Sequence, residues 1–142
     1  MLKFTFLTKE FYADYSSCKE IERKEHRPHI QLTIDVNGVL FCIPMRSNIN
    51  HPHVLWTDKK NKCGIDFSKA VVITDRDRYL DHLNKPFIRQ NEFDSLRGKE
   101  HIIEQKMIKY IRDYKMAKAN LSIARNRMLV MCSTLQYFEE YL

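Results

Sequence analysis

Glycine is scarce in this sequence, and its scarcity excludes two large groups of nucleotide-binding proteins. The 142 residues include three glycines, Gly38, Gly64 and Gly98, which lie far apart. A P-loop and a GxGxxG dinucleotide fingerprint both need closely spaced glycines, because the backbone must approach phosphate groups without a Cβ in the way. We therefore expect neither nucleotide-binding motif.

Metal ligands in a recognisable spacing are also missing. No CxxC pair and no HExxH sequence occurs, and the nearest approach to a ligand cluster is His51-Pro52-His53. The four cysteines are Cys18, Cys42, Cys63 and Cys132. For a protein without export signals, we expect these cysteines to be reduced core thiols, and we expect no metal and no cofactor.

Long apolar runs are absent as well. No uncharged apolar stretch approaches the roughly 20 residues that a transmembrane helix needs. The first residues alternate and are soon followed by charge, so they do not form a signal-peptide hydrophobic block. With 44% hydrophobic and 30% charged residues, the composition is that of a globular protein. We expect one domain over residues 1–142 and a cytoplasmic location.

What the sequence does have is a basic block near its C-terminal end. Residues 95–130 hold nine basic and three acidic side chains, a net charge of +6, which equals the formal net charge of the whole chain. Such a block indicates a polyanion partner, and a solvated helix face is the alternative. Charge by itself leaves both interpretations open.

The N-terminal third of the chain predicts a strand, a helix and a hairpin. Residues 2–7 alternate as a half-buried strand does, and Thr8 can cap an amphipathic helix to about residue 24. Alternation over residues 30–36, followed by Asn37-Gly38, predicts a β-hairpin with a type I′ turn. The returning strand, residues 39–43, is apolar on both faces, so we expect it in the centre of a sheet.

The remainder predicts short strands and then helices. Strands are expected at 53–57 and 69–74 with a polar loop over 58–63 between them, and a weaker extended piece around residues 86–88. A helical period then predicts one long helix over roughly 99–131 with a break near Asn120. Ser133 and Gln136 form a capping-box pattern for a short terminal helix. The helix stripe consists of Ile103, Met107, Tyr110, Ile111, Tyr114, Ala117 and Leu121.

The loop that leaves the central strand carries the densest chemistry. Arg46, Ser47, Asn48 and His51 lie within six residues of one another. A metal-independent ribonuclease needs side chains of these types, because the RNA supplies its own nucleophile and the protein positions the phosphate, moves two protons and stabilises negative charge. A polar turn without a catalytic role would show the same residues.

The order of several short motifs resembles a known toxin family. The strand and amphipathic helix are followed by Arg27-Pro28-His29-Ile30, the exit Pro44-Met45-Arg46-Ser47, the stretch 63–73 and a long basic helix with Tyr110-Ile111-Arg112. Over nearly the whole chain this order is similar to the endoribonuclease toxins of type III toxin–antitoxin systems, the ToxN/AbiQ family, and within it the CptN and TenpN branches.

The resemblance implies a fold and an activity. The expected fold is a single α+β domain, with a twisted, mainly antiparallel sheet whose core is related to the MazF and Kid toxins, flanking helices and a long basic C-terminal helix. The expected activity is metal-independent RNA cleavage that leaves a 2′,3′-cyclic phosphate, in phage defence by abortive infection. The expected partner is a repeated RNA pseudoknot antitoxin, which the toxin cuts from a precursor and which inhibits it in a closed toxin–RNA hetero-oligomer.

The resemblance also implies site residues. The family exit motif places the catalytic serine at Ser47. The family has Thr before that serine and Lys two residues after it, where this chain has Arg46 and Ile49, so Arg46 or His51 is expected to take over charge stabilisation or proton transfer. Tyr110 matches an aromatic position in the long helix and is either an RNA-stacking residue or a core residue. The remaining RNA-binding candidates are Asn48, Lys59, Lys99, Lys106, Lys109 and Arg112.

Two other functions remain open on the same residues. A non-catalytic RNA-binding module would also need a basic helix and a sheet, although RNP-type aromatic motifs are absent. A MazF-like ribonuclease inhibited by a protein antitoxin would share the core. Tandem short repeats in the upstream DNA would favour an RNA antitoxin, and a small acidic upstream reading frame would favour a protein antitoxin.

Overall fold

The hairpin that the sequence predicts most clearly organises the sheet. The computed structural model describes residues 2–22 and 28–142. In it β2 (Gln31–Val36) pairs antiparallel along its whole length with the first six residues of β3 (Val39–Arg46). Asn37 and Gly38 both have positive φ, 52° and 82°, as a type I′ turn requires. The predicted hairpin is confirmed.

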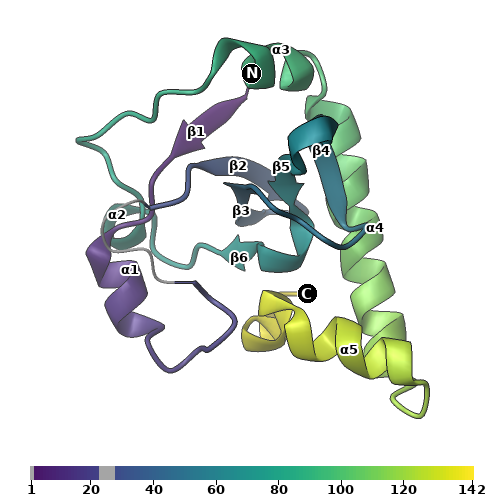
Figure 1. Ribbon diagram of the computed structural model, residues 1–142. Coiled ribbons are helices and arrows are strands. Elements are labelled where there is room, and N and C mark those ends of the chain that lie inside the picture. Colours follow the sequence, from purple (N-terminus) through teal and green to yellow (C-terminus); the bar gives the residue numbers. More distant parts are fainter. Residues whose placement is uncertain (1, 23–27) are drawn as a thin grey trace.

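Strand β3 lies in the centre of the sheet, as its two apolar faces predict. One edge of β3 pairs with β2, and the other edge pairs with β6 (Val71–Val72) in its first half and β5 (Cys63–Asp66) in its second. β1 (Lys3–Thr5) extends the sheet beyond β2, and β4 (Val54–Asp58) extends it beyond β5. In the part of the chain that the structure describes, six strands form this antiparallel sheet and five α-helices surround it, an α+β fold (Figure 1).

Strand β5 was not predicted. Instead of an unbroken polar loop between two strands, the chain makes a 3₁₀ turn over Lys59–Asn61 and then enters β5 against both β3 and β4. Alternation fails as a signal here because the strand is four residues long and buried on both faces. Gly64 is needed in it, since a Cβ there would lie 2.5 Å from the Leu55 carbonyl oxygen on β4.

The N-terminal helix is shorter than its pattern predicts. Thr8 caps α1 (Lys9–Asp14) by accepting a hydrogen bond from the Phe11 amide, but the helix ends at Tyr15. Ser16 and Ser17 follow, and serine competes for backbone hydrogen bonds in helices. The chain continues to residue 22 in turns, so that Glu20 comes near Lys69 and Glu22 pairs with Arg46 on β3. The predicted helix end near residue 24 lies outside the described residues.

The predicted long helix is two helices. α4 (Glu100–Lys118) and α5 (Ala124–Cys132) are separated by a turn at the predicted break near Asn120, and α5 runs back toward the sheet (Figure 1). Burial of the stripe along α4 is confirmed at Ile103, Met107, Tyr110, Tyr114 and Ala117. Ile111 is half-buried, and Leu121 is exposed because α4 has already ended. Short helices α2 (Arg76–Tyr79) and α3 (Gln90–Leu96) precede α4, and residues 86–88 between them form no regular element.

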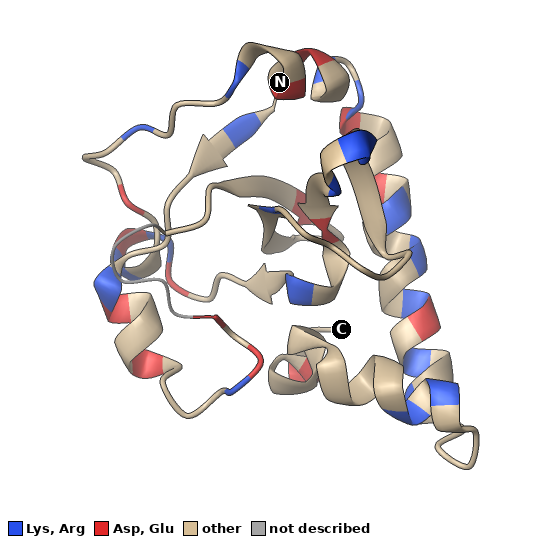
Figure 2. Cartoon of the chain, in the orientation of Figure 1, with Lys and Arg blue, Asp and Glu red and all other residues tan. Residues whose placement is uncertain are grey.

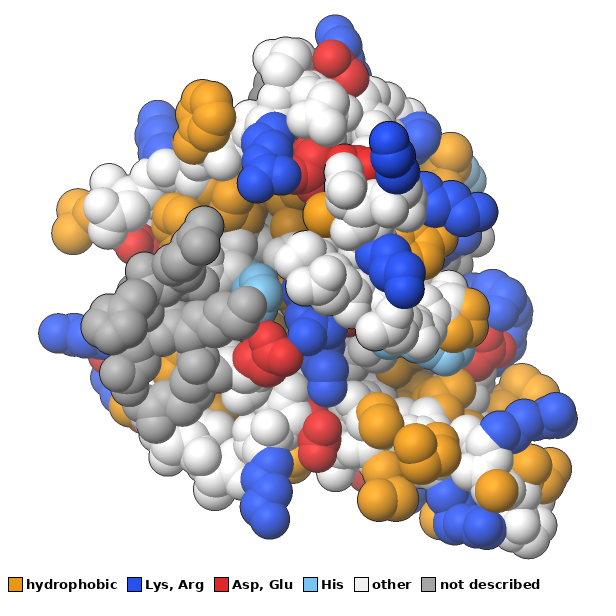
Figure 3. All heavy atoms as spheres, viewed as in Figure 1, with side chains coloured by type: hydrophobic (Ala, Val, Ile, Leu, Met, Phe, Trp, Pro, Cys, Tyr) orange, Lys and Arg blue, Asp and Glu red, His pale blue; other side chains and the backbone are white. Residues whose placement is uncertain are grey.

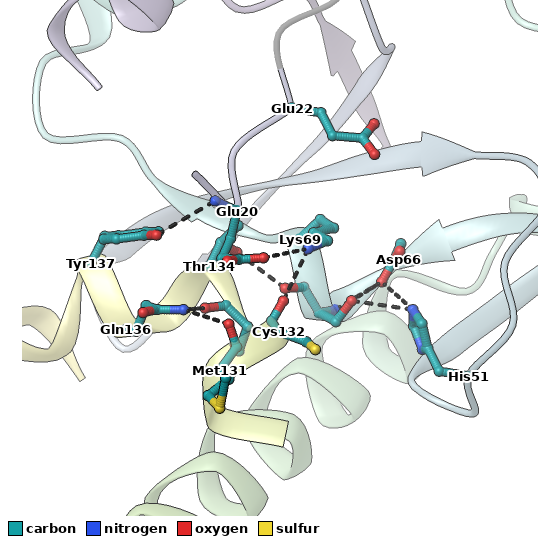
Figure 4. Close-up of polar contacts among 12 residues, drawn as sticks. Glu20, Glu22, His51, Asp66, Lys69, Met131, Cys132, Thr134, Gln136 and Tyr137 are labelled. Carbon is teal, nitrogen blue, oxygen red and sulfur yellow. Dashed lines mark hydrogen bonds and ion pairs between the residues drawn. The ribbon is translucent and has the colours of Figure 1, made fainter. Parts of the chain in front are cut away.

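The C-terminal segment anchors α5 to the sheet. Ser133 caps a 3₁₀ turn over Thr134–Tyr137, and a second 3₁₀ turn covers Glu139–Tyr141, where the sequence predicts a short α-helix. The predicted capping box is wrong in one respect, because it requires the Gln136 side chain to accept from the Ser133 amide. Instead the Gln136 side-chain amide donates to carbonyl oxygens at the end of α5 and just after it, at Val130, Met131 and Ser133 (Figure 4). The Thr134 hydroxyl donates to Ala70 and Ser68 carbonyls behind the sheet edge.

Over the described ranges 2–22 and 28–142, the helices are too short or too polar for any of them to span a membrane.

Candidate functional site

Asp66 is the centre of the densest polar cluster. It stands at the end of β5, adjacent to the end of β3, and its side chain is fully buried. Its Oδ1 atom accepts from the Ser68 amide at 2.9 Å, the Ser68 hydroxyl at 2.6 Å and His51 Nε2 at 3.1 Å. Its Oδ2 atom accepts from Arg46 Nη1 at 2.6 Å. One carboxylate therefore holds Arg46, His51 and Ser68 together (Figure 4 shows the His51 side).

The Asp66 carboxylate is ionised at neutral pH. Burial alone would raise its pKa, but hydrogen bonds from His51, Ser68 and Arg46 prevail and lower the pKa to about 2. A group with this pKa does not deliver protons near pH 7. Asp66 therefore orients and balances charge rather than acting as an acid.

His51 has a defined tautomer in this arrangement. It lies in the loop between β3 and β4, where its Nδ1 atom accepts a hydrogen bond of 3.1 Å from the His53 backbone amide. The neutral ring must then carry its own proton on Nε2, which faces Asp66 and the Ser68 hydroxyl. In a proton-transfer histidine, a carboxylate holds one ring nitrogen and the other nitrogen faces the substrate. Here Asp66 holds Nε2, so Nδ1 can act on a substrate only when the substrate displaces the His53 amide from it. His51 is partly exposed, so a substrate can reach it.

Arg46 is held from two sides. Nη1 contacts Asp66, and Nη2 contacts Glu22 Oε1 at 2.8 Å. Glu22 Oε2 also lies 3.1 Å from His29 Nε2, and His29 Nδ1 lies 3.2 Å from the Met45 carbonyl oxygen. Two carboxylates facing one guanidinium reduce the positive charge that it presents to a phosphate. The predicted role of Arg46 in charge stabilisation remains a prediction, with Glu22 as a competitor for the same cation.

Ser47 lies on the Arg46 side of the cluster. It is exposed, directly after β3, and it lines a groove of about 470 Å³ together with His29, Arg46, Phe87 and Arg89. Asn48 follows with a left-handed φ of 56° and is also exposed. By contrast, His51 and Ser68 line a different cavity, between α4 and α5. The structure therefore brings Arg46 and His51 together through Asp66 and leaves Ser47 on one side of them.

The basic RNA-binding candidates lie along α4 and around the sheet edge (Figure 2). Lys106 and Lys109 line a groove of about 120 Å³ with His53, and Lys109 also pairs with Asp113 at 2.6 Å. Lys99 stands at the start of α4, Arg112 on its exposed face, and Lys59 in the turn between β4 and β5. Of these residues, Lys106 and Lys109 come closest to the His51 loop.

Tyr110 is a core residue in this structure. Its side chain is 3% exposed, its hydroxyl donates to the buried Ser133 hydroxyl at 2.8 Å, and burial raises its pKa. Its ring packs edge-on against His53 with centroids 5.3 Å apart, and burial, together with the neighbouring His51, lowers the pKa of His53. A base cannot stack on a ring covered in this way, so the burial favours the core alternative.

The cysteines differ from their expected location. All four are free, but only Cys42 is buried, whereas Cys132 is exposed and Cys18 and Cys63 are half-buried. In the described residues, no group of three or more histidine, cysteine or acidic side chains is arranged to hold a metal ion.

Sequence reasoning missed Asp66, Ser68 and Glu22 as site residues. Asp66 and Ser68 carry a local signal, because an aspartate two residues before a serine can cap the turn that follows, as Asp66 does. Nothing local indicates Glu22, which reaches Arg46 from a segment 24 residues away.

Comparison of this chain with protein-family models, with curated proteins and with solved structures finds no match. Function is therefore inferred from the side chains and their arrangement.

Proposed function

We propose that this protein is a metal-independent endoribonuclease toxin. The observation that carries the proposal is the buried Asp66 carboxylate, which holds a partly exposed histidine and an arginine next to each other at the exit of the central strand. A proton-transfer group and a cation at fixed separation are what RNA cleavage by its own 2′-hydroxyl requires. The residues for this chemistry come from β3, β5 and the loop between β3 and β4.

The proposed reaction uses the RNA as its own nucleophile. The 2′-oxygen forms a bond to phosphorus while its proton passes to a base, the bond from phosphorus to the 5′-oxygen breaks, and a proton is delivered to that oxygen. His51 takes the 2′-hydroxyl proton at Nδ1, from which the substrate displaces the His53 amide, and water gives a proton to the 5′-oxygen. Arg46 offsets the charge of the phosphorane, and the Ser47 hydroxyl donates to a phosphate oxygen. The products carry a 2′,3′-cyclic phosphate and a 5′-hydroxyl.

The toxin–antitoxin context is part of the proposal. The α+β architecture with its antiparallel sheet is compatible with a MazF/Kid-like core, and the Lys and Arg side chains of α4 supply charge for RNA phosphates (Figure 2). We propose that a repeated pseudoknot RNA inhibits the toxin in the cytoplasm in a closed hetero-oligomer. Purification after co-expression with the upstream DNA tests this partner, since a bound small RNA supports it and a bound acidic protein contradicts it.

The activity itself is tested with purified protein and single-stranded RNA in EDTA. Cleavage with 2′,3′-cyclic phosphate ends is expected. The His51→Gln variant should cleave RNA about 10²–10⁴-fold more slowly, because glutamine keeps a donor toward Asp66 but has no basic nitrogen. His82→Gln is the matched control, since His82 is exposed, contacts the Arg76 carbonyl oxygen and lines neither of the two hollows beside Asp66. Activity that needs Mg²⁺ would contradict the proposal, and RNA binding without cleavage would favour the non-catalytic module.

A further inference from the structure

A cavity between α4 and α5 begins at the His51 side of the cluster. It measures about 680 Å³, and His51 and Ser68 lie at its inner end, while α4 and α5 form its walls. Ligand cavities in proteins have volumes of about 300–1,000 Å³ and are mostly apolar with a few polar groups. This cavity fits that description, and it opens beside the proposed proton-transfer residue.

The wall of the cavity is apolar and accessible. Met116, Met128 and Leu129 line it, and Met128 is 59% exposed. In Figure 3, hydrophobic side chains gather over α5 at the lower right of the molecule. An exposed patch of this kind next to a polar site is typical of a binding surface.

The cavity is held open by the turn between its two helices. The Asn126 amide donates to the Asn120 carbonyl at 2.9 Å, and the Arg127 guanidinium donates to the carbonyls of Leu121 and Ser122 at 2.8 and 3.1 Å. These bonds fix where α5 starts relative to the end of α4. The walls are therefore preformed, which lowers the entropic cost of binding.

The cavity contains a negatively charged side chain, Asp113, whereas a phosphate site needs positive charge. Asp113 lines the cavity, and Lys109 holds its Oδ2 atom at 2.6 Å. A carboxylate repels phosphate but accepts hydrogen bonds from the amino groups of nucleobases. Lys106 and Lys109, in the adjoining groove with His53, supply the positive charge that a nucleotide's phosphate needs.

We propose that this cavity binds one nucleobase of the RNA substrate and selects a base with an exocyclic amino group. The inference rests on the proposed ribonuclease function. The base lies between the apolar side chains of α4 and α5, Asp113 accepts from its amino group, and its phosphate lies toward His51 and the Lys106–Lys109 groove. Uracil presents carbonyl oxygens on both sides of its N3–H group and is disfavoured at a carboxylate. Proteins that read single-stranded RNA likewise hold splayed bases and hydrogen-bond their edges.

Binding of the four ribonucleoside 3′-monophosphates, measured by NMR titration, tests the cavity without depending on cleavage. We expect adenine, guanine or cytosine nucleotides to bind at least several-fold more tightly than the uracil nucleotide. The Asp113→Asn variant should lose most of this preference, because an amide both donates and accepts. Ala117→Leu, which fills the cavity wall, should weaken all four.

A matched pair of variants on α5 separates the cavity from general charge effects. Met128 and Met131 are 59% and 63% exposed, but only Met128 lines the cavity. Met128→Glu should weaken nucleotide binding by about tenfold or more, and Met131→Glu should leave it nearly unchanged. Melting temperatures of all variants identify any that fail to fold, and in that case the Met128–Met131 comparison decides.

Two results would overturn the inference. One is equal binding of all four nucleotides with no effect of Asp113→Asn, and the other is an equal effect of Met128→Glu and Met131→Glu. If the nucleotides bind as expected but the wild-type protein does not cleave RNA, the cavity stands and the ribonuclease function fails. If RNA is cleaved with a base preference that Asp113→Asn leaves unchanged, the function stands and the inference about this cavity fails.

Discussion

The two hollows beside Asp66 are built differently. In the groove with Arg46 and Ser47, the arginine forms ion pairs with Asp66 and with Glu22 of the N-terminal segment. The α4–α5 cavity, which starts at His51 and Ser68, has apolar walls and exposed methionines. The two oxygens of one carboxylate serve the two sides, since Oδ2 holds Arg46 and Oδ1 holds His51 and Ser68.

One side of Asp66 therefore holds charged groups in place, and the other side offers a cavity whose shape can fit a ligand. The Arg46 side depends on the fully buried Asp66 carboxylate. Electrostatic interactions are strong in the protein interior, so removing one member of a buried ion pair costs unfolding free energy. The cavity side depends on the spacing of two helices and on side chains that make few polar contacts. Disturbing Asp66 should therefore affect both sides, whereas a change on either side should stay local.

The largest effect is expected from Asp66→Ala. This substitution leaves Arg46 and His51 without their shared partner, and removing one member of a buried pair typically costs about 3–5 kcal/mol of unfolding free energy. The control is Asp94→Ala, whose carboxylate pairs with Arg97 at 2.6 Å, the same distance as in the Asp66–Arg46 pair, but at an exposed position. Its loss should cost at most about 1 kcal/mol. Urea unfolding measures both, and equal losses would mean that Asp66 does not organise the site.

Acid titration gives a second view of Asp66. Its folded pKa of about 2 lies below the ordinary value of 3.8, so the stabilisation is fully present above the ordinary pKa and is lost as the pH falls through about 2. Its size is about 2 kcal/mol, from the free energy that corresponds to each pKa unit. The Asp66→Asn protein should show a flatter fall in stability between pH 4 and pH 2 than the wild type. An unchanged acid dependence would contradict the lowered pKa.

Ser47→Ala tests the polar groove alone. Because Ser47 is exposed after β3, the variant should fold normally. It should cleave RNA about 10²–10³-fold more slowly, the usual effect of removing one hydrogen-bond donor to a developing negative charge. Stability and nucleotide binding in the α4–α5 cavity should not change. Ser16→Ala, also exposed, serves as the control, and full activity of the Ser47→Ala protein would exclude Ser47 from the site.

Charge reversal on α4 tests whether RNA crosses the cavity side. The Lys106→Glu/Lys109→Glu double variant should weaken RNA binding and reduce the slope of log K against log salt by about one to two, because the slope is proportional to the number of phosphates that the protein neutralises. Lys3→Glu/Lys9→Glu makes the same change in net charge on β1 and α1, away from α4 (Figure 1), and should leave the slope close to that of the wild type. An equal slope change in both double variants would show that the RNA does not follow α4.

The smallest effect is expected from Tyr110→Phe. The variant keeps the buried ring and removes the hydrogen bond to Ser133, which should cost about 1 kcal/mol of unfolding free energy. RNA affinity should stay the same because the side chain is covered. Unchanged stability combined with weaker RNA binding would instead assign the hydroxyl to the RNA.

Local patterns in the sequence determined much of the fold. Asn37-Gly38 specified the hairpin because its two positions accept positive φ, and the unbroken apolar run of residues 39–43 placed β3 in the centre. The helical stripe predicted the buried face of α4, and the break near Asn120 was visible in the same stretch. Among the elements that were missed, β5 and α2 are four residues long, too short for a period to show.

The sequence by itself placed Arg46, Ser47 and His51 in one loop region, and the tertiary structure decided how they differ. Only the pairing of β5 with β3 brings Asp66 under Arg46 and His51, and only the path of the N-terminal segment brings Glu22 to the same arginine. The α4–α5 cavity likewise depends on the angle at which α5 returns. Residues far apart in the chain make these contacts, and no local period records them, because strand pairing and helix docking arise from burial of the whole core.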